Sequence, residues 1–170
     1  MTLYQMVAVA IALAAAATDV RSHRIPNVLT FGAAFVAVLV HGYADGWSGG
    51  GLGIAGWLVG AVLFFPFFAL GGMGAGDVKL LAAIGAWLGP GAIIWVALYA
   101  SIAGAVMALI VGAWAGYLGK AFTNLWCLFM HWRMHGPQPM ADLTLASTRG
   151  PRLAYAVPIL AGLMVTLWLR

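Results

Sequence analysis

The sequence contains no glutamate, a single cysteine and very few charged residues of any kind. Charged residues make up 7% of its 170 positions, whereas a soluble domain averages about 25%. Together with a hydrophobic content of 64% and a mean hydropathy of +1.00, this scarcity excludes an ordinary soluble protein and predicts an integral membrane protein. The single cysteine, Cys127, excludes an internal disulfide and a cysteine-based zinc site.

Because acidic residues are so scarce, each carboxylate requires an explanation. The four acids are Asp19, Asp45, Asp77 and Asp142. Asp45 falls in an expected turn, where aspartate is common, and Asp142 falls in the longest polar region. Asp19 and Asp77 each border a strongly apolar run, where a carboxylate costs free energy and indicates a functional site. These two residues are therefore the candidates for chemistry.

Apolar runs separated by short polar breaks predict one all-α, membrane-embedded domain over residues 1–170. The run at 78–88 would rise only about 16 Å as a helix, less than the roughly 30 Å of a hydrocarbon core. It is therefore either a half-membrane helix or one extended by the loop before it. An aromatic-rich piece at 121–132 is expected to lie along the membrane interface. The six expected membrane segments are 3–18, 27–42, 51–70, 78–88, 91–118 and 153–169, with a polar turn at 43–50.

The first apolar run has the alanine content of a signal peptide, but its flanking charges are on the wrong side. A signal peptide carries positive charge before its apolar stretch, and here Arg21 and Arg24 follow that stretch. We therefore expect a retained first helix whose N-terminus lies outside the cell.

Positive charge is concentrated on one side of this topology. Alternation from an outside N-terminus places 19–26, 71–79 and 119–152 on the same face, with seven of the eight lysines and arginines. Loops rich in lysine and arginine face the cytoplasm, so this face is predicted to be cytoplasmic. The pI of about 9.6 therefore reflects membrane orientation rather than nucleic-acid binding. Asp19 and Asp77 fall on this face too, although the count used only basic residues.

Two carboxylates at one membrane depth suggest acid–base chemistry. Neighbouring carboxylates repel each other when both are ionised, so the pair is expected to share one proton near neutral pH. One aspartate can then take a proton from water while the other protonates or polarises a peptide carbonyl, as in aspartic proteases. No Ser/His/Asp or Cys/His arrangement competes with this pair. We expect no metal site, because His131 and His135 would supply only two ligands.

A glycine-rich loop precedes Asp77. Gly74 and Gly76 are expected to let a substrate backbone approach the carboxylate, although glycines also allow close helix packing. Lys79 either alters the acidity of the two aspartates or contacts the substrate. In the alternative role its ammonium extends to the membrane interface and helps to set the topology. Structural roles also exist for the two acids. Asp77 would cap a helix that starts at Val78, and Asp19 would pair with a nearby arginine.

Two motifs carry a family resemblance. The segment Gly74-Ala75-Gly76-Asp77 fits the GxGD signature, and Val78-Lys79-Leu80 continues it as in type IV prepilin peptidases. The segment at 19–27, an aspartate followed by basic residues and Ile-Pro-Asn, is similar to that family's first-aspartate motif. GxGD alone is short, but the two motifs in order and on matching helix ends are specific. The resemblance covers nearly the whole chain.

The resemblance implies an intramembrane aspartic endopeptidase. Asp19 and Asp77 would be its catalytic pair, and no cofactor would be needed. It would cleave the leader of pilin-like precursors in the bilayer, at the cytoplasmic face of the bacterial inner membrane. Larger members carry an N-terminal domain with paired CxxC motifs and methylate the new N-terminus. This chain has one cysteine and begins at the first helix, so we expect the short, peptidase-only form of tight-adherence (Flp-type) pilus systems, without methylation.

Near the C-terminus, short members often read Pro-Tyr-Gly/Ala-Val before an apolar helix. Here the order at 152–158 places the proline after the tyrosine and valine, so this region is assigned no catalytic role. From another functional class, a small proton-coupled transporter or channel subunit would use Asp19 and Asp77 as a proton relay. A relay needs carboxylates at the middle of the bilayer, and both lie at one end.

Overall fold

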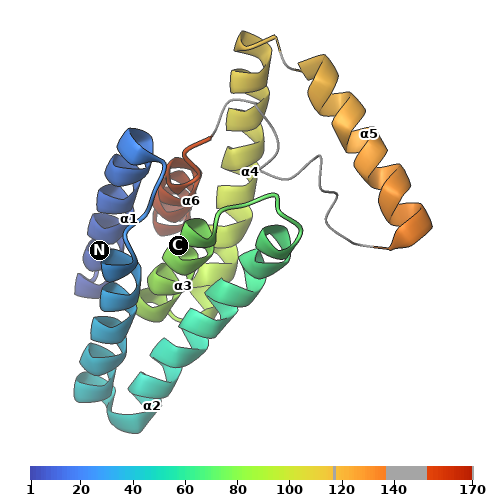
Figure 1. The fold of residues 1–170 in the computed structure, drawn as a ribbon. Coiled ribbons are helices and arrows are strands. Elements are labelled where there is room, and N and C mark those ends of the chain that lie inside the picture. The colour runs from blue at the N-terminus through green and yellow to red at the C-terminus, as the bar shows by residue number, and fades with distance from the viewer. Residues whose placement is uncertain (117, 137–152, 170) are drawn as a thin grey trace.

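The computed structural model describes residues 1–116, 118–136 and 153–169, and these residues form an all-α helical bundle (Figure 1). The predicted all-α class is confirmed. In chain order the helices are α1 (Leu3–Ser22), α2 (Asn27–Ala69), α3 (Ala75–Leu88), α4 (Pro90–Trp114), α5 (Leu118–His135) and α6 (Ala156–Leu169).

Helix α2 consists of two helices joined at Gly46, where the chain reverses direction (Figure 1). Gly46 has φ 65° and ψ −152°, a conformation that glycine adopts without a steric penalty. The polar turn expected at 43–50 is therefore wrong in length, because the residues on both sides of Gly46 are helical. With 43 residues, α2 is long enough to cross a bilayer twice.

Helices α1, α2 and α4 are each long and apolar enough to cross a membrane, and α6 is a shorter apolar helix. Counting α2 as two passes, these helices and the short α3 account for the six predicted membrane segments. Several helix ends differ from the prediction by three or four residues. Helix α1 continues to Ser22, α3 begins at Ala75, α4 ends at Trp114 and α6 begins at Ala156. Hydropathy alone does not mark the first or last turn of a helix.

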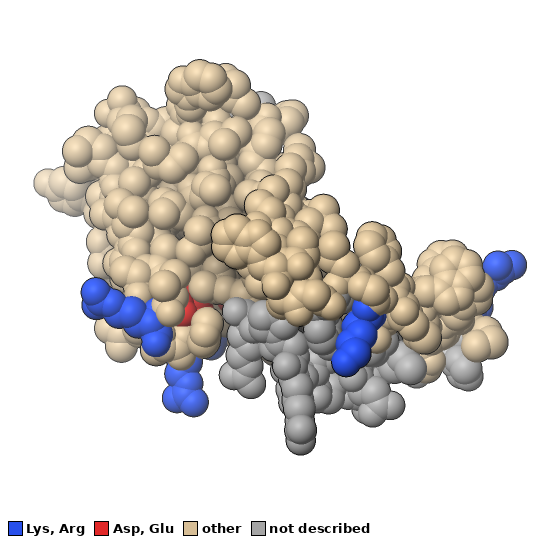
Figure 2. Space-filling model, turned by 90° about the horizontal axis from the view of Figure 1, so that it is seen from above, with Lys and Arg blue, Asp and Glu red and all other residues tan. Residues whose placement is uncertain are grey.

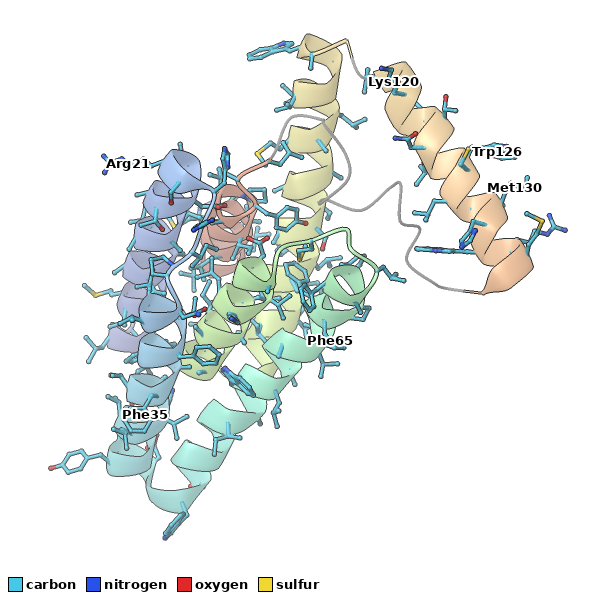
Figure 3. All side chains as sticks on the ribbon, in the orientation of Figure 1. Arg21, Phe35, Phe65, Lys120, Trp126 and Met130 are labelled. Atoms are coloured by element: carbon cyan, nitrogen blue, oxygen red, sulfur yellow. The ribbon has the colours of Figure 1, made fainter. Side chains whose placement is uncertain are left out.

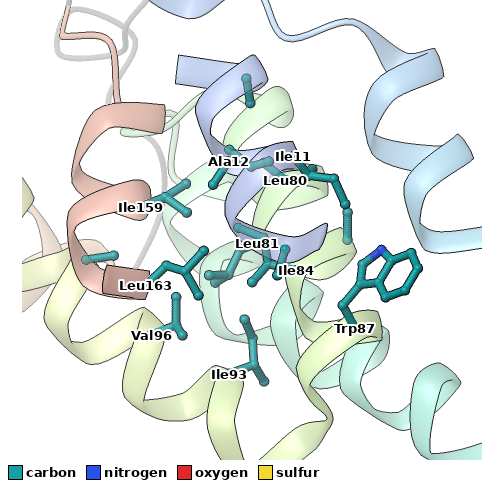
Figure 4. Close-up of a cluster of buried hydrophobic side chains, with 14 of the residues drawn as sticks. Ile11, Ala12, Leu80, Leu81, Ile84, Trp87, Ile93, Val96, Ile159 and Leu163 are labelled. Atoms are coloured by element: carbon teal, nitrogen blue, oxygen red, sulfur yellow. The ribbon is translucent and has the colours of Figure 1, made fainter. Parts of the chain in front are cut away.

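The short helix α3 forms the centre of the core. Nearly all of its side chains are buried, which explains how a helix of 14 residues keeps its place in the bundle. Figure 4 shows its side chains meeting those of α1, α4 and α6. The contributing residues include Leu80, Leu81 and Ile84 of α3, Ile11 of α1, Ile93 and Val96 of α4, and Ile159 and Leu163 of α6.

Glycines let α2 and α3 touch backbone to backbone. A Cβ added to Gly56 of α2 would overlap the carbonyl of Gly85 in α3, and one added to Gly85 would overlap the carbonyl of Gly56. One turn along α2, a Cβ on Gly60 would lie 2.7 Å from the carbonyl oxygen of Leu81. Small residues are the usual means of close helix packing in membranes. This contact positions α3, and with it Asp77.

Helix α5 extends the aromatic piece expected at 121–132 to Leu118–His135. It lies beside the bundle, and its labelled side chains Trp126 and Met130 point away from the other helices (Figure 3). Phe122, Leu125, Trp126 and Phe129 are all more than half exposed. The helix is thus confirmed, and its contact with the membrane interface stays a prediction. Asp142 lies outside the described residues.

Candidate active site

Asp19 lies in the last turn of α1. The helix ends with His23 in the left-handed conformation, and the His23 backbone N–H donates to the Asp19 carbonyl. The Asp19 side chain is only 7% exposed, and its Oδ2 accepts a 3.1 Å hydrogen bond from the backbone N–H of Ala156. Arg21 and Arg24 are exposed. Asp19 is therefore held by the first residue of α6, where the helix dipole favours negative charge.

Asp77 lies in the first turn of α3. The helix begins at Ala75, three residues earlier than predicted, and its N-cap is the backbone of Gly74. Gly76 and Asp77 are thus helical and not part of the loop. The Asp77 side chain is 9% exposed, and the Gly74 backbone amide faces its carboxylate. Asp77 is not the N-cap, but it still lies at the positive end of the helix dipole.

The structure brings the two aspartates to the same end of the bundle. The end of α1 and the start of α3 both lie on the side of the bundle away from the Gly46 turn (Figure 1), and the two carboxylates are close enough for their charges to interact. Figure 2 looks onto this end, where acidic atoms appear in one small area with basic side chains beside them, and further basic side chains lie toward the right of the view. Residues separated by 58 positions in the chain therefore form one pair.

The segments that carry the two motifs also contact each other. A Cβ on Gly76 would lie 3.3 Å from Cβ of Ile25, so Gly76 packs against the loop between α1 and α2. The Lys79 ammonium donates a 3.0 Å hydrogen bond to Asn27 Oδ1 and lies 5.3 Å from the centre of the Phe31 ring. Lys79 is thus directed toward α2.

A cavity of about 420 Å³ opens beside Asp77. Its walls come from α2, the glycine loop, α3, α4 and the residues just before α6. Gly74 borders the carboxylate directly, because a Cβ added there would lie 3.1 Å from Asp77 Oδ2. Lys79 and Gly76 are not part of this wall. The lining residues are Phe64, Phe67, Gly72, Met73, Gly74, Asp77, Ser101, Gly104, Ala105, Ala108, Leu153 and Tyr155.

The arrangement suits acid–base chemistry on a substrate in this cavity. Two carboxylates with different hydrogen-bond partners are the groups that activate water and protonate a leaving atom. Among the described residues, no three His, Cys, Asp or Glu side chains gather as metal ligands.

Comparison with known proteins places this site in a family. A model of the type IV leader peptidase family matches residues 6–109, a range that contains both aspartates and both motifs. The chain belongs to the type IV leader peptidase family. Its predicted resemblance to that family is thus confirmed.

Two curated relatives carry the same printed name, prepilin leader peptidase/N-methyltransferase. They come from Burkholderia pseudomallei strains 1026b and K96243, and each is 50% identical to this chain over 54 residues. That stretch is 32% of this chain and 17% of the relative, so the chain matches less than a fifth of the relatives' length. No solved structure matches.

The sequence interpretation missed Tyr155, which lines the cavity together with Asp77. It lies beyond the part of the chain that the leader peptidase family model matches, in the region to which no catalytic role was assigned. One signal was available. The predicted topology placed 119–152 on the same face as Asp19 and Asp77, and Tyr155 is a polar aromatic residue near the start of the span that follows, 153–169.

Proposed function

We propose that this protein is an intramembrane aspartic endopeptidase that removes the leader peptide of type IV, Flp-like prepilin precursors at the cytoplasmic face of the bacterial inner membrane. The observation that carries the proposal is the buried pair of Asp19 and Asp77 at one end of the bundle, beside a cavity that Asp77 lines. Membership of the leader peptidase family supports the reaction class.

In the proposed mechanism the two carboxylates hold one proton between them, because two charges in a buried site repel each other. We assign Asp77 as the acid because it lines the cavity in which the substrate carbonyl would lie. Asp19, held by the Ala156 N–H, is then the base. Asp19 takes a proton from water as the water oxygen attacks the peptide carbonyl carbon. Asp77 gives its proton to the carbonyl oxygen. The C–N bond of the tetrahedral intermediate then breaks as Asp19 gives the proton taken from water to the leaving nitrogen, and Asp77 takes a proton back from a hydroxyl of the intermediate.

The position of the pair fits a precursor whose basic leader precedes an apolar helix. The scissile bond of such a chain lies at the cytoplasmic membrane surface, the depth we propose for the pair. The substrate must be extended there, because a helix engages its carbonyls in internal hydrogen bonds. The curated relatives are named prepilin leader peptidases, which supports a prepilin substrate. The Flp-like assignment rests on the sequence resemblance alone.

The proposal is tested by co-expression with an Flp-type prepilin precursor, with leader removal read on a gel. We expect Asp19→Asn and Asp77→Asn each to abolish cleavage, since each removes a proton-transfer group while preserving size. Asp45→Asn is the matched control, because Asp45 is exposed beside the Gly46 turn at the opposite end of the bundle. All three variants should insert into the membrane. Retained cleavage in either of the first two variants would falsify the catalytic pair.

A proton relay in a small transporter or channel subunit is the alternative from another class. Such a relay needs ionisable groups along a path through the bilayer. The described residues place both aspartates at one end, so no feature of the structure favours this alternative over the peptidase.

A further inference from the structure

The phenol of Tyr155 is held in the cavity that contains Asp77 by contacts on two sides. Its ring meets Phe64 of α2 edge to face, with centroids 5.9 Å apart and planes at 72°. On the other side the ring lies directly on Gly104 of α4, where an added Cβ would be 2.7 Å from both the Tyr155 hydroxyl oxygen and its Cε2. Any side chain larger than hydrogen at position 104 would displace the phenol. The ring is therefore positioned by packing.

Tyr155 and Ser101 line the same wall of this cavity. Ser101 donates its own proton to the carbonyl oxygen of Ala97, at 2.8 Å. A phenol has one proton to donate. Rotation about the Tyr155 C–O bond can turn this proton toward an acceptor in the cavity.

The chain around Tyr155 is also tied to the other aspartate. The next residue, Ala156, donates its backbone N–H to Asp19, while Tyr155 and Asp77 share one cavity wall. Tyr155, just before α6, thus lines the cavity with Asp77, and Ala156, the first residue of α6, binds Asp19. A neutral hydrogen-bond donor therefore lies on the cavity wall that carries Asp77.

We propose that Tyr155 is a further catalytic residue, whose hydroxyl donates a hydrogen bond to the carbonyl oxygen of the scissile peptide. The inference rests on the proposed peptidase function. As the water oxygen bonds to the carbonyl carbon, the carbonyl π bond breaks and negative charge develops on its oxygen. Asp77 supplies the proton that this oxygen gains, and Tyr155 stabilises the developing charge without losing its own proton. Donors aimed at developing charge act mainly on the transition state.

The test measures kcat and KM for cleavage of a prepilin precursor by the purified full chain. Tyr155→Phe keeps the ring on Phe64 and Gly104 and removes only the hydroxyl. We expect kcat to fall on the order of a hundredfold, as for loss of one such donor, with KM changed by less than about twofold. The melting temperature should stay that of the wild type. Ser101→Ala, on the same cavity wall, should lower kcat less, because it leaves the Tyr155 hydroxyl and the packing of its ring in place.

Tyr99→Phe is the matched control, since Tyr99 lies on α4 against Trp95 and not in the cavity, and its kcat should equal the wild-type value. A kcat within about twofold of wild type in Tyr155→Phe, with Asp77→Asn inactive, would overturn this inference and leave the peptidase proposal standing. A fall in kcat accompanied by a lower melting temperature would indicate a packing role and also overturn it. A wild-type chain that cleaves no prepilin would overturn both proposals.

Discussion

At the scale of single residues, the two aspartates differ in what surrounds them. Asp19 accepts a hydrogen bond from the amide at the start of α6, whereas Asp77 lies by the Gly74 amide and on the wall of the cavity. An amide N–H lies by each carboxylate, and such a donor favours the ionised form of both. The difference between them is the cavity, which Asp77 lines, and it supports the proposed roles of Asp77 as acid and Asp19 as base.

Gly74 is the glycine whose missing side chain leaves the Asp77 carboxylate accessible. Its φ of −77° and ψ of 145° are open to any residue, so the backbone does not require glycine there. Gly74→Val should therefore fold and place two methyl groups beside Asp77 Oδ2. We expect cleavage to slow by at least about tenfold, since small displacements of bound substrate are costly.

The measurement is the initial rate of leader removal at equal amounts of inserted protein. Gly51→Val is the control, because Gly51 lies on α2 with no atom within 4 Å of an added Cβ. Gly76→Val is less informative, since its side chain would press on Ile25. An unchanged rate in Gly74→Val would remove the access role from this residue.

At the scale of helices, α3 is a short element placed by its neighbours. It has 14 residues, about 21 Å at 1.5 Å per residue, and Asp77 lies in its first turn. The backbone contact of Gly56 with Gly85 fixes the opposite half of α3 against α2. A shift of α3 along its axis would therefore move Asp77 relative to Asp19, which is carried by α1.

Gly85→Ala should destabilise the protein more than a surface glycine substitution does. The new methyl group would overlap the Gly56 carbonyl and approach Ile93 Cγ1 to 3.1 Å, and overpacking of this kind costs about 1 to 3 kcal/mol. Thermal unfolding in detergent should show a lower midpoint for Gly85→Ala. Gly51→Ala, with open space around its Cβ, should match the wild type or exceed it. Equal midpoints for the two variants would contradict the proposed packing role.

At the scale of the whole molecule, the aspartate pair and the Gly46 turn lie at opposite ends of the bundle (Figure 1). Arg21 and Lys120, labelled in Figure 3, lie at the end that carries the pair. Basic residues mark the cytoplasmic side of membrane proteins. The proposed orientation therefore places the aspartate pair at the cytoplasmic face of the membrane and the Gly46 turn outside the cell.

This orientation can be tested with single cysteines in a Cys127→Ser background. Trp47 is fully exposed beside the Gly46 turn, so Trp47→Cys should react with a membrane-impermeant maleimide added to spheroplasts. Ser22→Cys, exposed at the end of α1, should react only after lysis, because the reagent cannot cross the bilayer. The reverse labelling pattern would overturn the cytoplasmic assignment.

The sequence by itself determined the membrane class, the helical fold and the two candidate aspartates. Hydropathy and the scarcity of acids are local properties, so they are readable without knowing which helices touch. The same reasoning misplaced the start of α3, because Gly74 to Asp77 have no strong helical preference. It did not show the contact of Asn27, the first residue of α2, whose side chain accepts a hydrogen bond from Lys79.

Only the tertiary structure decided what surrounds the pair. The hydrogen bond from Ala156 to Asp19 joins residues 137 positions apart, and Tyr155 enters the cavity because α4 carries a glycine at position 104. Neither contact leaves a periodic pattern in the sequence, since each depends on how α6 packs against α1 and α4. The local sequence was therefore enough to identify Asp19 and Asp77 as candidates. The packing of α6 against α1 and α4 determined which groups lie around them.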